Sequence, residues 1–378
     1  MENSSARLDA LDGLRGFAAF YVVLHHMSTN RLLPAYPILL HGSMLVDTFF
    51  VISGFVMAYQ YRARLDSVSS AASFVRRRFA RIWPLHAAIL CTMMIPRLVG
   101  LVLNGATGSP LFQAAGDHSL ASWLASLTLL NGMGLYDYAV WNGPSWTVSV
   151  EFFAYLVFAA AALRGGRWLN SIALTIVIGA STILIAKGIY LAGPIQYSFL
   201  RCLVGFFCGV LAMAGYDFLA TRHVLDKTKA IVVEGVFFAL AILLLWFGSA
   251  STGLAFPPVC GILVAVLALG RSPLARLLSS RFFQRLGAWS LAMYLLHIPL
   301  LNALWSADSW TTYVDLHFRF GWGTRESIVF LVLVLGIAAL AHNLLEKPAR
   351  DWLGGRGRRV YVPTPASLPA VVSGEQLS

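Results

Sequence analysis

Long apolar runs recur along the whole of this chain and limit what it can fold into. They span 16 to 22 residues, the length that an α-helix needs to cross the hydrocarbon core of a bilayer. Hydrophobic residues make up 58% of the chain and charged residues only 12%, which excludes a soluble domain of this size. We therefore predict an all-α, multi-pass membrane protein with ten spans, at about 14–31, 43–61, 83–104, 144–163, 168–187, 197–214, 231–249, 255–270, 288–306 and 327–346.

Basic residues orient these spans, because cytoplasmic loops are enriched in Lys and Arg. With the N-terminus in the cytoplasm, the inner segments hold 22 of the 28 Lys and Arg residues. Both termini are therefore expected inside. The net charge of +11 then reflects topology and attraction to anionic membrane lipids, and we do not infer nucleic-acid binding from it. The shorter apolar segment 119–133 is expected to be interfacial or re-entrant.

Neither end of the chain suggests a separate soluble domain. The first apolar run contains an arginine and no cleavage site of small residues follows it, so we expect a retained anchor rather than a signal peptide. We expect one membrane domain over 1–350 and a disordered cytoplasmic tail over 351–378, which is rich in Gly, Arg and Pro. The four cysteines lie in apolar runs without metal-ligand spacing, so no metal site is predicted.

The first span carries an arginine and two histidines, and such residues inside a membrane usually have a function. Arg15 and His26 are eleven residues apart, about three helical turns plus 20° and about 16 Å of rise, so they share one face. His25 is turned about 80° away from the face of Arg15, in the direction opposite to His26. A neutral imidazole suits a general base, which makes His26 the catalytic candidate. The alternative is a histidine that only hydrogen-bonds neighbouring helices.

Two carboxylates are expected at the depth of His26 in the membrane. Asp47 lies about four residues inside the outer end of the second span. It needs a partner there, either His26 or an arginine, unless it is only a helix cap. Glu151 lies about seven residues inside the fourth span. Since acidic residues contribute little to orientation, we predict a functional role for Glu151.

Small and polar residues accompany both carboxylates. Ser53 and Gly54 form a notch where a helix or a ligand can approach closely. Trp146 and Ser149 flank Glu151 in the segment GPSWTVSVEFF. We regard Ser53, Trp146 and Ser149 as candidates for acceptor binding or for supporting the catalytic residues.

A basic cluster precedes the third span, in the segment SFVRRRFARIWP. Arg78 and Arg81 are three residues apart and share a helix face, and their guanidinium groups suit phosphates. The alternative is an ordinary cytoplasmic loop that binds lipid headgroups.

In the ninth span, Tyr294 and His297 also share a face. Either residue can donate a hydrogen bond to a carbonyl or a phosphate. The alternative is that both residues only form contacts between neighbouring helices.

Six segments carry a family resemblance. LDGLRGFAAFYVVLHH, MLVDTFFVISGFVM, RRRFARIWP, GPSWTVSVEFF, SLAMYLLHIP and LLEKP occur in this order between about residues 8 and 350. Together they resemble the membrane-bound acyltransferase 3 family of bacterial O-acyltransferases, in its single-domain branch without a fused esterase-like domain. Arg15 and His26 match that family's arginine, ten residues, histidine motif, and Arg78 with Arg81 match its paired arginines.

The resemblance implies transfer of an acyl group, usually acetyl, from cytoplasmic acyl-CoA to a glycan or glycolipid hydroxyl in the bacterial inner membrane. It implies acyl-CoA as a co-substrate and no tightly bound cofactor, and it leaves an oligomer open. In this hypothesis Arg15, Arg78 and Arg81 hold the phosphates, and Asp47 or Glu151 orients His26. Tyr294, His297 or Ser149 then stabilises the oxyanion. Direct transfer and an acyl-histidine intermediate both stay open.

Two other functions compete with this hypothesis. Intramembrane His, Asp and Glu also mark transport pathways, so a flippase for a glycan intermediate is an alternative, although no internal repeat is visible. The acceptor can also be a small molecule such as a macrolide or a lipid. We expect acceptor choice to reside in the outer loops 105–143 and 307–326, where Tyr136, Tyr138 and Trp141 suit stacking on sugars.

Overall fold

The computed structural model describes residues 6–30, 32–104, 119–189, 195–222, 224–248, 252–313 and 324–354. Within these ranges the regular elements are helices and none is a strand. The main helices are α1 (Ala6–Thr29), α2 (Pro37–Leu40), α3 (Leu45–Tyr61), α4 (Val68–Asn104), α5 (Leu120–Leu127), α6 (Trp146–Leu163), α7 (Gly166–Ala186), α8 (Ser198–Thr221), α9 (Lys227–Phe247), α10 (Phe256–Ala268), α11 (Pro273–Leu278), α12 (Arg281–Tyr313), α13 (Thr324–Ala341) and α14 (Lys347–Leu353).

Eight helices in the described part of the chain are long and apolar enough to cross a membrane. They coincide with predicted spans two to seven, nine and ten. The two remaining predicted spans coincide with α1, which has 24 residues, and with the shorter apolar helix α10. The all-α, polytopic fold class is thereby confirmed, while the count of ten and the inside location of both termini stay predictions.

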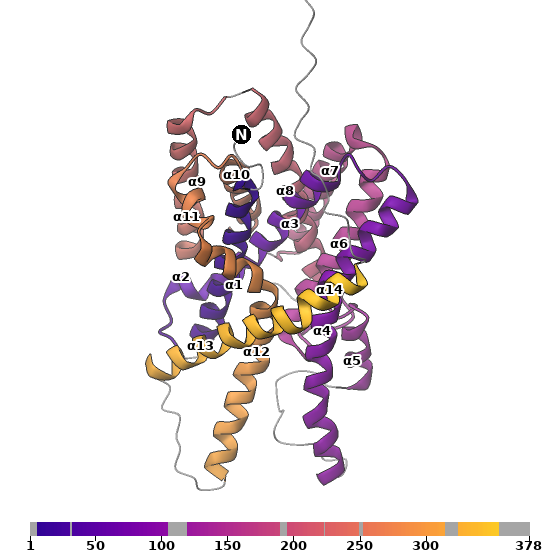
Figure 1. Ribbon diagram of the computed structural model, residues 1–378, viewed down its shortest axis with the longest axis vertical. Coiled ribbons are helices and arrows are strands. Elements are labelled where there is room, and N and C mark those ends of the chain that lie inside the picture. Colours follow the sequence, from indigo (N-terminus) through magenta and orange to yellow (C-terminus); the bar gives the residue numbers. More distant parts are fainter. Residues whose placement is uncertain are drawn as a thin grey trace, which may run out of the picture.

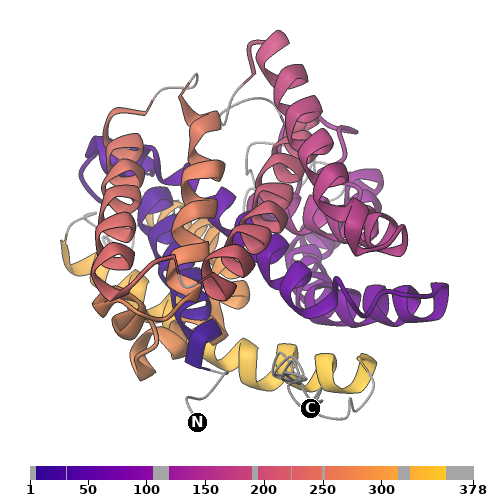
Figure 2. The same cartoon turned by 90° about the horizontal axis from the view of Figure 1, so that it is seen from above.

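The helix α1 lies among the other helices rather than at the edge (Figure 1). It packs along α12 and also contacts α3 and α10, and α3 packs along α8. The last helices are arranged differently, because α13 and α14 run across α12 and α4 (Figure 1) and line one side of the bundle when it is seen from above (Figure 2). Elements from both ends of the chain therefore meet beside α4.

Glycines allow the closest helix crossings. A Cβ atom on Gly16 of α1 would lie 2.3 Å from the backbone nitrogen of Gly287 in α12, so the two backbones touch without intervening side chains. Gly54 in α3 meets α8 in the same way, since its Cβ would lie 1.8 Å from the carbonyl oxygen of Phe206. The predicted notch at Ser53 and Gly54 thus admits a neighbouring helix, as small residues in membrane helices commonly do.

Two predicted boundaries differ from the helix ends that the structure shows. The helix α4 begins at Val68 and contains Pro84 and Pro96, so the basic cluster before position 83 lies in a helix and not in a loop. Membrane helices tolerate internal prolines because neighbouring groups satisfy the freed backbone atoms. The helix α14 continues to Leu353, past the predicted domain end at 350, and positions 355–378 lie outside the described residues. The segment 119–133 contains α5, whose eight residues are too short to span a membrane, as expected.

Candidate active site

A pocket between α1, α3, α4, α6 and α12 brings together six of the predicted site residues, and we call it the chamber. Its lining combines charged, hydroxyl and apolar side chains. The residues are Arg15, Phe49, Phe50, Ser53, Met57, Arg78, Arg81, Ile82, Thr147, Val148, Glu151, Tyr155, Ser290, Leu291 and Tyr294. Arg15, Ser53, Arg78, Arg81, Glu151 and Tyr294 come from five separate helices, so only the fold assembles them.

Three arginines reach the chamber with different degrees of pairing. Arg15 donates to Asp12 at 2.8 Å. Arg78 lies over the Tyr61 ring at 5.6 Å, and no acceptor among the described residues pairs with its buried Nε. The structure shows no hydrogen bond or ion pair between Arg81 and any other described side chain. A buried donor without an acceptor is costly, so an anionic ligand would complete the hydrogen bonding of Arg78.

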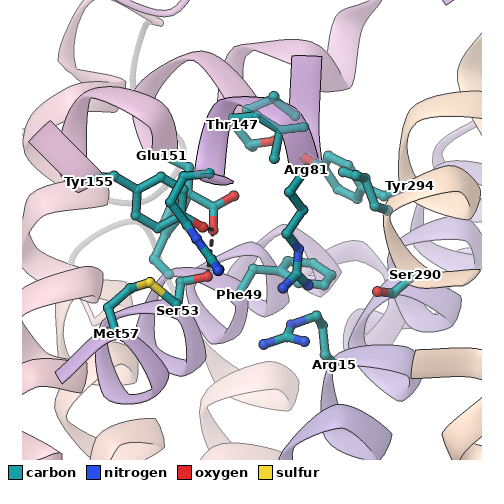
Figure 3. Close-up of a pocket in the computed structure, with 15 residues that line it drawn as sticks. Arg15, Phe49, Ser53, Met57, Arg81, Thr147, Glu151, Tyr155, Ser290 and Tyr294 are labelled. Atoms are coloured by element: carbon teal, nitrogen blue, oxygen red, sulfur yellow. Dashed lines mark hydrogen bonds between the residues drawn. The ribbon is translucent and has the colours of Figure 1, made fainter. Parts of the chain in front are cut away.

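Glu151 lies across the chamber from Arg15 and Arg81 (Figure 3). Its Oε1 accepts hydrogen bonds from the Ser53 hydroxyl at 2.5 Å and from the Tyr155 hydroxyl at 2.6 Å. Two donors from two helices thus fix the carboxylate in one position. Figure 3 shows the guanidinium groups of Arg15 and Arg81 entering the same space from opposite sides.

A second pocket adjoins the chamber, and we call it the vestibule. It lies between α1, α4, α12, α14 and the π-helix η7 (His342–Glu346). Its lining is strongly polar, with Asp12, Arg15, Arg81, Gln284, Gly287, Ala288, His342, Asn343, Glu346, Lys347 and Arg350. Arg15 and Arg81 line both pockets, so these two side chains stand at the junction.

His26 lies beyond the chamber and faces α12. Its Nδ1 is 3.0 Å from the Val22 carbonyl oxygen and 3.2 Å from Nε2 of His297. The Nδ1 of His297 is 3.2 Å from the Met293 carbonyl oxygen. A carbonyl oxygen only accepts hydrogen bonds, so each ring carries its hydrogen on Nδ1. The one Nδ1 hydrogen of His26 is then shared between the Val22 carbonyl oxygen and Nε2 of His297, and His26 keeps an unprotonated Nε2.

His25 points elsewhere, as the helical arithmetic predicted. Its Nδ1 donates to the Leu39 carbonyl oxygen at 2.7 Å, which ties α1 to α2. Tyr294 instead links the chamber to the other histidines, because it lines the chamber and its ring lies 5.8 Å from the ring of His297. The pair His26 and His297 is therefore separated from the chamber by one aromatic ring.

The expectation that Asp47 or Glu151 orients His26 was wrong. Asp47 is fully buried and forms a two-pronged ion pair with Arg201, whose Nε and Nη2 lie 2.9 and 3.0 Å from its two oxygens. Arg201 also donates to the Ser43 carbonyl oxygen at 2.7 Å. Of the two partners that the sequence left open for Asp47, the arginine is the one present, and it lies in α8.

Ser149 and Trp146 are engaged within the protein. The Ser149 hydroxyl donates to the Leu129 carbonyl oxygen at 2.5 Å and accepts from the Gly132 backbone at 3.1 Å. Arg201 lies over the Trp146 ring at 5.6 Å. Neither residue is among those that line the chamber or the vestibule, so both support the structure around the site.

Part of the outer loop is also structural. Trp141 was expected to suit sugar stacking, but it is 4% exposed and its indole nitrogen donates to the Ser122 hydroxyl at 3.0 Å. Tyr138 is exposed and Tyr136 is half-buried, so these two stay candidates for sugar stacking. Positions 105–118 and 314–323 of the acceptor loops lie outside the described residues.

Sequence reasoning missed several polar partners. Arg201 lies near the start of the sixth predicted span, and an arginine inside an apolar run is a signal that could have identified it. The Nδ1 of His342 lies 3.0 Å from a carboxylate oxygen of Glu346, a contact that the sequence analysis did not anticipate. This contact depends on the π-helix η7, for which the sequence contains no recognisable signal.

Comparisons with known proteins support an enzyme. A family model described as an acyltransferase domain matches residues 8–342. The acyltransferase MdmB of Streptomyces mycarofaciens is 28% identical over 96% of this chain and 96% of its own length. Protein 2 in the picA locus of Rhizobium radiobacter is 35% identical over 23% of this chain and 44% of its own length. No solved structure matches this chain.

Proposed function

This chain belongs to the acyltransferase 3 family and is a membrane acyltransferase, and on that premise we propose that it moves an acetyl group from cytoplasmic acyl-CoA to a hydroxyl group of a glycan or glycolipid. The observation that carries the donor assignment is the set of three arginines around the chamber. Arg81 lines both pockets and forms no hydrogen bond with another described side chain, and the buried Nε of Arg78 has no acceptor among the described residues. Guanidinium groups bind phosphates through charge-assisted hydrogen bonds, and acyl-CoA is a donor with several phosphates.

The acyl arm of the donor has a direction in which to extend. From Arg15, which lines the chamber, to His26, which contacts His297 in α12, the helix α1 rises about 16 Å. We propose that the thioester lies beside Tyr294, between the chamber and the two histidines. This arrangement requires Tyr294 to admit the thioester, because its ring separates the two regions.

His26 acts as the general base in this proposal. Its Nε2 takes the proton of the acceptor hydroxyl while the hydroxyl oxygen attacks the thioester carbonyl. The tetrahedral intermediate then expels the thiolate of CoA, which receives that proton from His26. His297 and the Val22 carbonyl oxygen hold the hydrogen of His26 on Nδ1, as orienting partners of catalytic histidines do.

Tyr294 is the candidate for stabilising the oxyanion. Ser149 already donates to a carbonyl oxygen, and the ring nitrogens of His297 are engaged with Met293 and His26. Tyr294 is the member of this trio that lines the chamber. A hydroxyl donor placed at the developing negative charge lowers the barrier.

Two classes of acceptor are compatible with the proposed reaction. Tyr136 and Tyr138 favour a sugar, because aromatic side chains near a membrane surface can stack on pyranose rings. A small hydroxylated molecule is the second candidate. The relative that matches over nearly its whole length is named as an acyltransferase without an acceptor, which is compatible with either choice. We propose the bacterial inner membrane as the location, with the donor on the cytoplasmic side.

The test is transfer by the purified protein in detergent, with radiolabelled acetyl-CoA and either host glycan or a panel of small alcohols. The variant His26→Ala should lose transfer while His25→Gln, at the neighbouring position, retains it. Near-normal turnover by a folded His26→Ala protein would overturn the role of His26 as base. If the parent protein neither hydrolyses acetyl-CoA nor transfers its acetyl group, the donor assignment fails.

A further inference from the structure

The vestibule and the chamber meet at two arginines but differ in what surrounds them. The vestibule is lined by polar residues from both ends of the chain. The chamber beyond it contains Phe49, Phe50 and Leu291. A ligand that extends through both pockets would therefore place a polar end against α14 and a less polar end between α3 and α12.

The charge balance of the vestibule favours an anion. Its lining contains four cationic side chains and two carboxylates. Both carboxylates are already engaged, since Asp12 accepts from Arg15 and Glu346 lies 3.0 Å from His342. Lys347 forms no hydrogen bond or ion pair with another described residue, and Arg350 lies 3.6 Å from the exposed Asp351. Cationic donors therefore stay open to a ligand.

The local backbone brings these cations to the junction. The π-helix η7 (His342–Glu346) interrupts the regular helix between α13 and α14, and such π-bulges often occur at functional sites. It is followed directly by α14, which packs against α4. Lys347 and Arg350 are three positions apart and share a helix face, and both residues line the vestibule.

We propose that the vestibule binds the phosphorylated nucleotide end of the donor, with Lys347 and Arg350 as phosphate-binding residues. The acyl arm then passes between Arg15 and Arg81 into the chamber. This role rests on the proposed function, because it assigns one part of the same donor to a second pocket. The C-terminal helix α14 thereby becomes part of the donor site.

The experiment compares two donors that share the acyl arm and differ in the nucleotide. Acetyl-CoA carries the nucleotide, whereas S-acetylpantetheine lacks it. In the double variant Lys347→Gln, Arg350→Gln, the KM for acetyl-CoA should rise about tenfold, because two charge-assisted contacts to phosphate are lost. Transfer from S-acetylpantetheine should stay at the level of the parent protein. The double variant Arg222→Gln, Lys227→Gln removes the same charge from exposed positions outside both pockets and serves as the control.

Two results would overturn the vestibule assignment. One is an unchanged KM for acetyl-CoA in the Lys347→Gln, Arg350→Gln protein. The other is an equal loss with both donors, which would mean that the two residues act on folding or on lipid headgroups. Size-exclusion chromatography separates the two causes of an equal loss. A variant with a folding defect does not elute as a monodisperse peak, whereas a variant that only loses lipid contacts does.

A binding measurement separates this inference from the proposed function. Equilibrium dialysis with CoA alone requires no acyl transfer, and the double variant should bind CoA about tenfold more weakly than the parent does. If the parent binds CoA in this way but transfers no acetyl group, the vestibule stands and the proposed reaction fails. If the parent transfers acetyl groups and both proteins bind CoA equally, the reaction stands and the vestibule assignment fails.

Discussion

The Nδ1 of His26 lies 3.2 Å from Nε2 of His297, although 271 positions separate the two residues in the sequence. The contact joins α1 to α12 along the helix pair that Gly16 and Gly287 bring together. Because His297 is 1% exposed and faces a carbonyl oxygen with its other nitrogen, its orientation is fixed. His297 thus acts together with the Val22 carbonyl oxygen to keep the hydrogen of His26 on Nδ1, which leaves Nε2 free to accept a proton.

Replacing His297 should affect turnover more than donor binding. In His297→Ala, the Nδ1 hydrogen of His26 keeps only the Val22 carbonyl oxygen and the ring loses its hydrogen bond to α12, so kcat should fall about tenfold or more, which corresponds to about 1.4 kcal/mol of transition-state stabilisation. The KM for acetyl-CoA should change little. Steady-state kinetics on the purified variant measure both quantities.

A conservative variant distinguishes positioning from packing. The side-chain oxygen of His297→Gln can accept the hydrogen bond from His26, so this variant should recover part of the lost kcat. If the Ala and Gln variants lose kcat equally while remaining folded, or if KM rises in place of a fall in kcat, His297 does not position His26.

Asp47 and Arg201 should matter to stability, because they form a buried ion pair. Removing one partner leaves an uncompensated charge, which typically costs about 3–5 kcal/mol. Arg201→Met should therefore lower the thermal unfolding temperature in detergent strongly, and the double variant Asp47→Leu, Arg201→Met should recover much of that loss. A double variant as unstable as the single one would show that the pair contributes more than charge compensation.

The helix-forming segments and several site residues could be predicted from the sequence, because spans and charges inside them follow from simple energetics. Arg15 and Glu151 were singled out because charged residues in apolar runs are costly without a function, and Arg78 with Arg81 because they share a helix face and suit phosphates. The helical repeat also separated His26 from His25, and the structure places their side chains against different helices.

Contacts between distant segments were not predictable in this way. Asp47 pairs with an arginine 154 positions away, and the sequence offers no rule that selects Arg201 over His26. The junction between chamber and vestibule depends on how α14 crosses α4, which follows from the packing of the whole bundle. Local patterns identified which residues were unusual, and only the fold determined their partners.

The basic cluster offers a direct test of the donor site. Arg81 lines both pockets, whereas Arg76 on the same helix is exposed and lines neither. Arg81→Gln should raise the KM for acetyl-CoA about tenfold or more, and Arg76→Gln should leave it unchanged. If the two variants behave alike, the cluster acts as a topological or lipid-binding element.

The crossing of α1 and α12 should not tolerate even one methyl group at Gly16. A Cβ there would lie 2.3 Å from the backbone nitrogen of Gly287, so the helices must move apart. Overpacking of this kind costs about 1–3 kcal/mol. Gly16→Ala should lower the unfolding temperature in detergent and weaken CoA binding, since Arg15 is displaced with its helix.

Gly179 in α7 provides the matched control for this substitution. A Cβ at that position meets no atom within 4 Å, and alanine is favoured over glycine in a helix by about 1 kcal/mol. Gly179→Ala should therefore be neutral or stabilising and should leave CoA binding intact. If Gly16→Ala were as stable as the parent and bound CoA equally well, the close approach of α1 and α12 would not be what positions Arg15 at the junction of the two pockets.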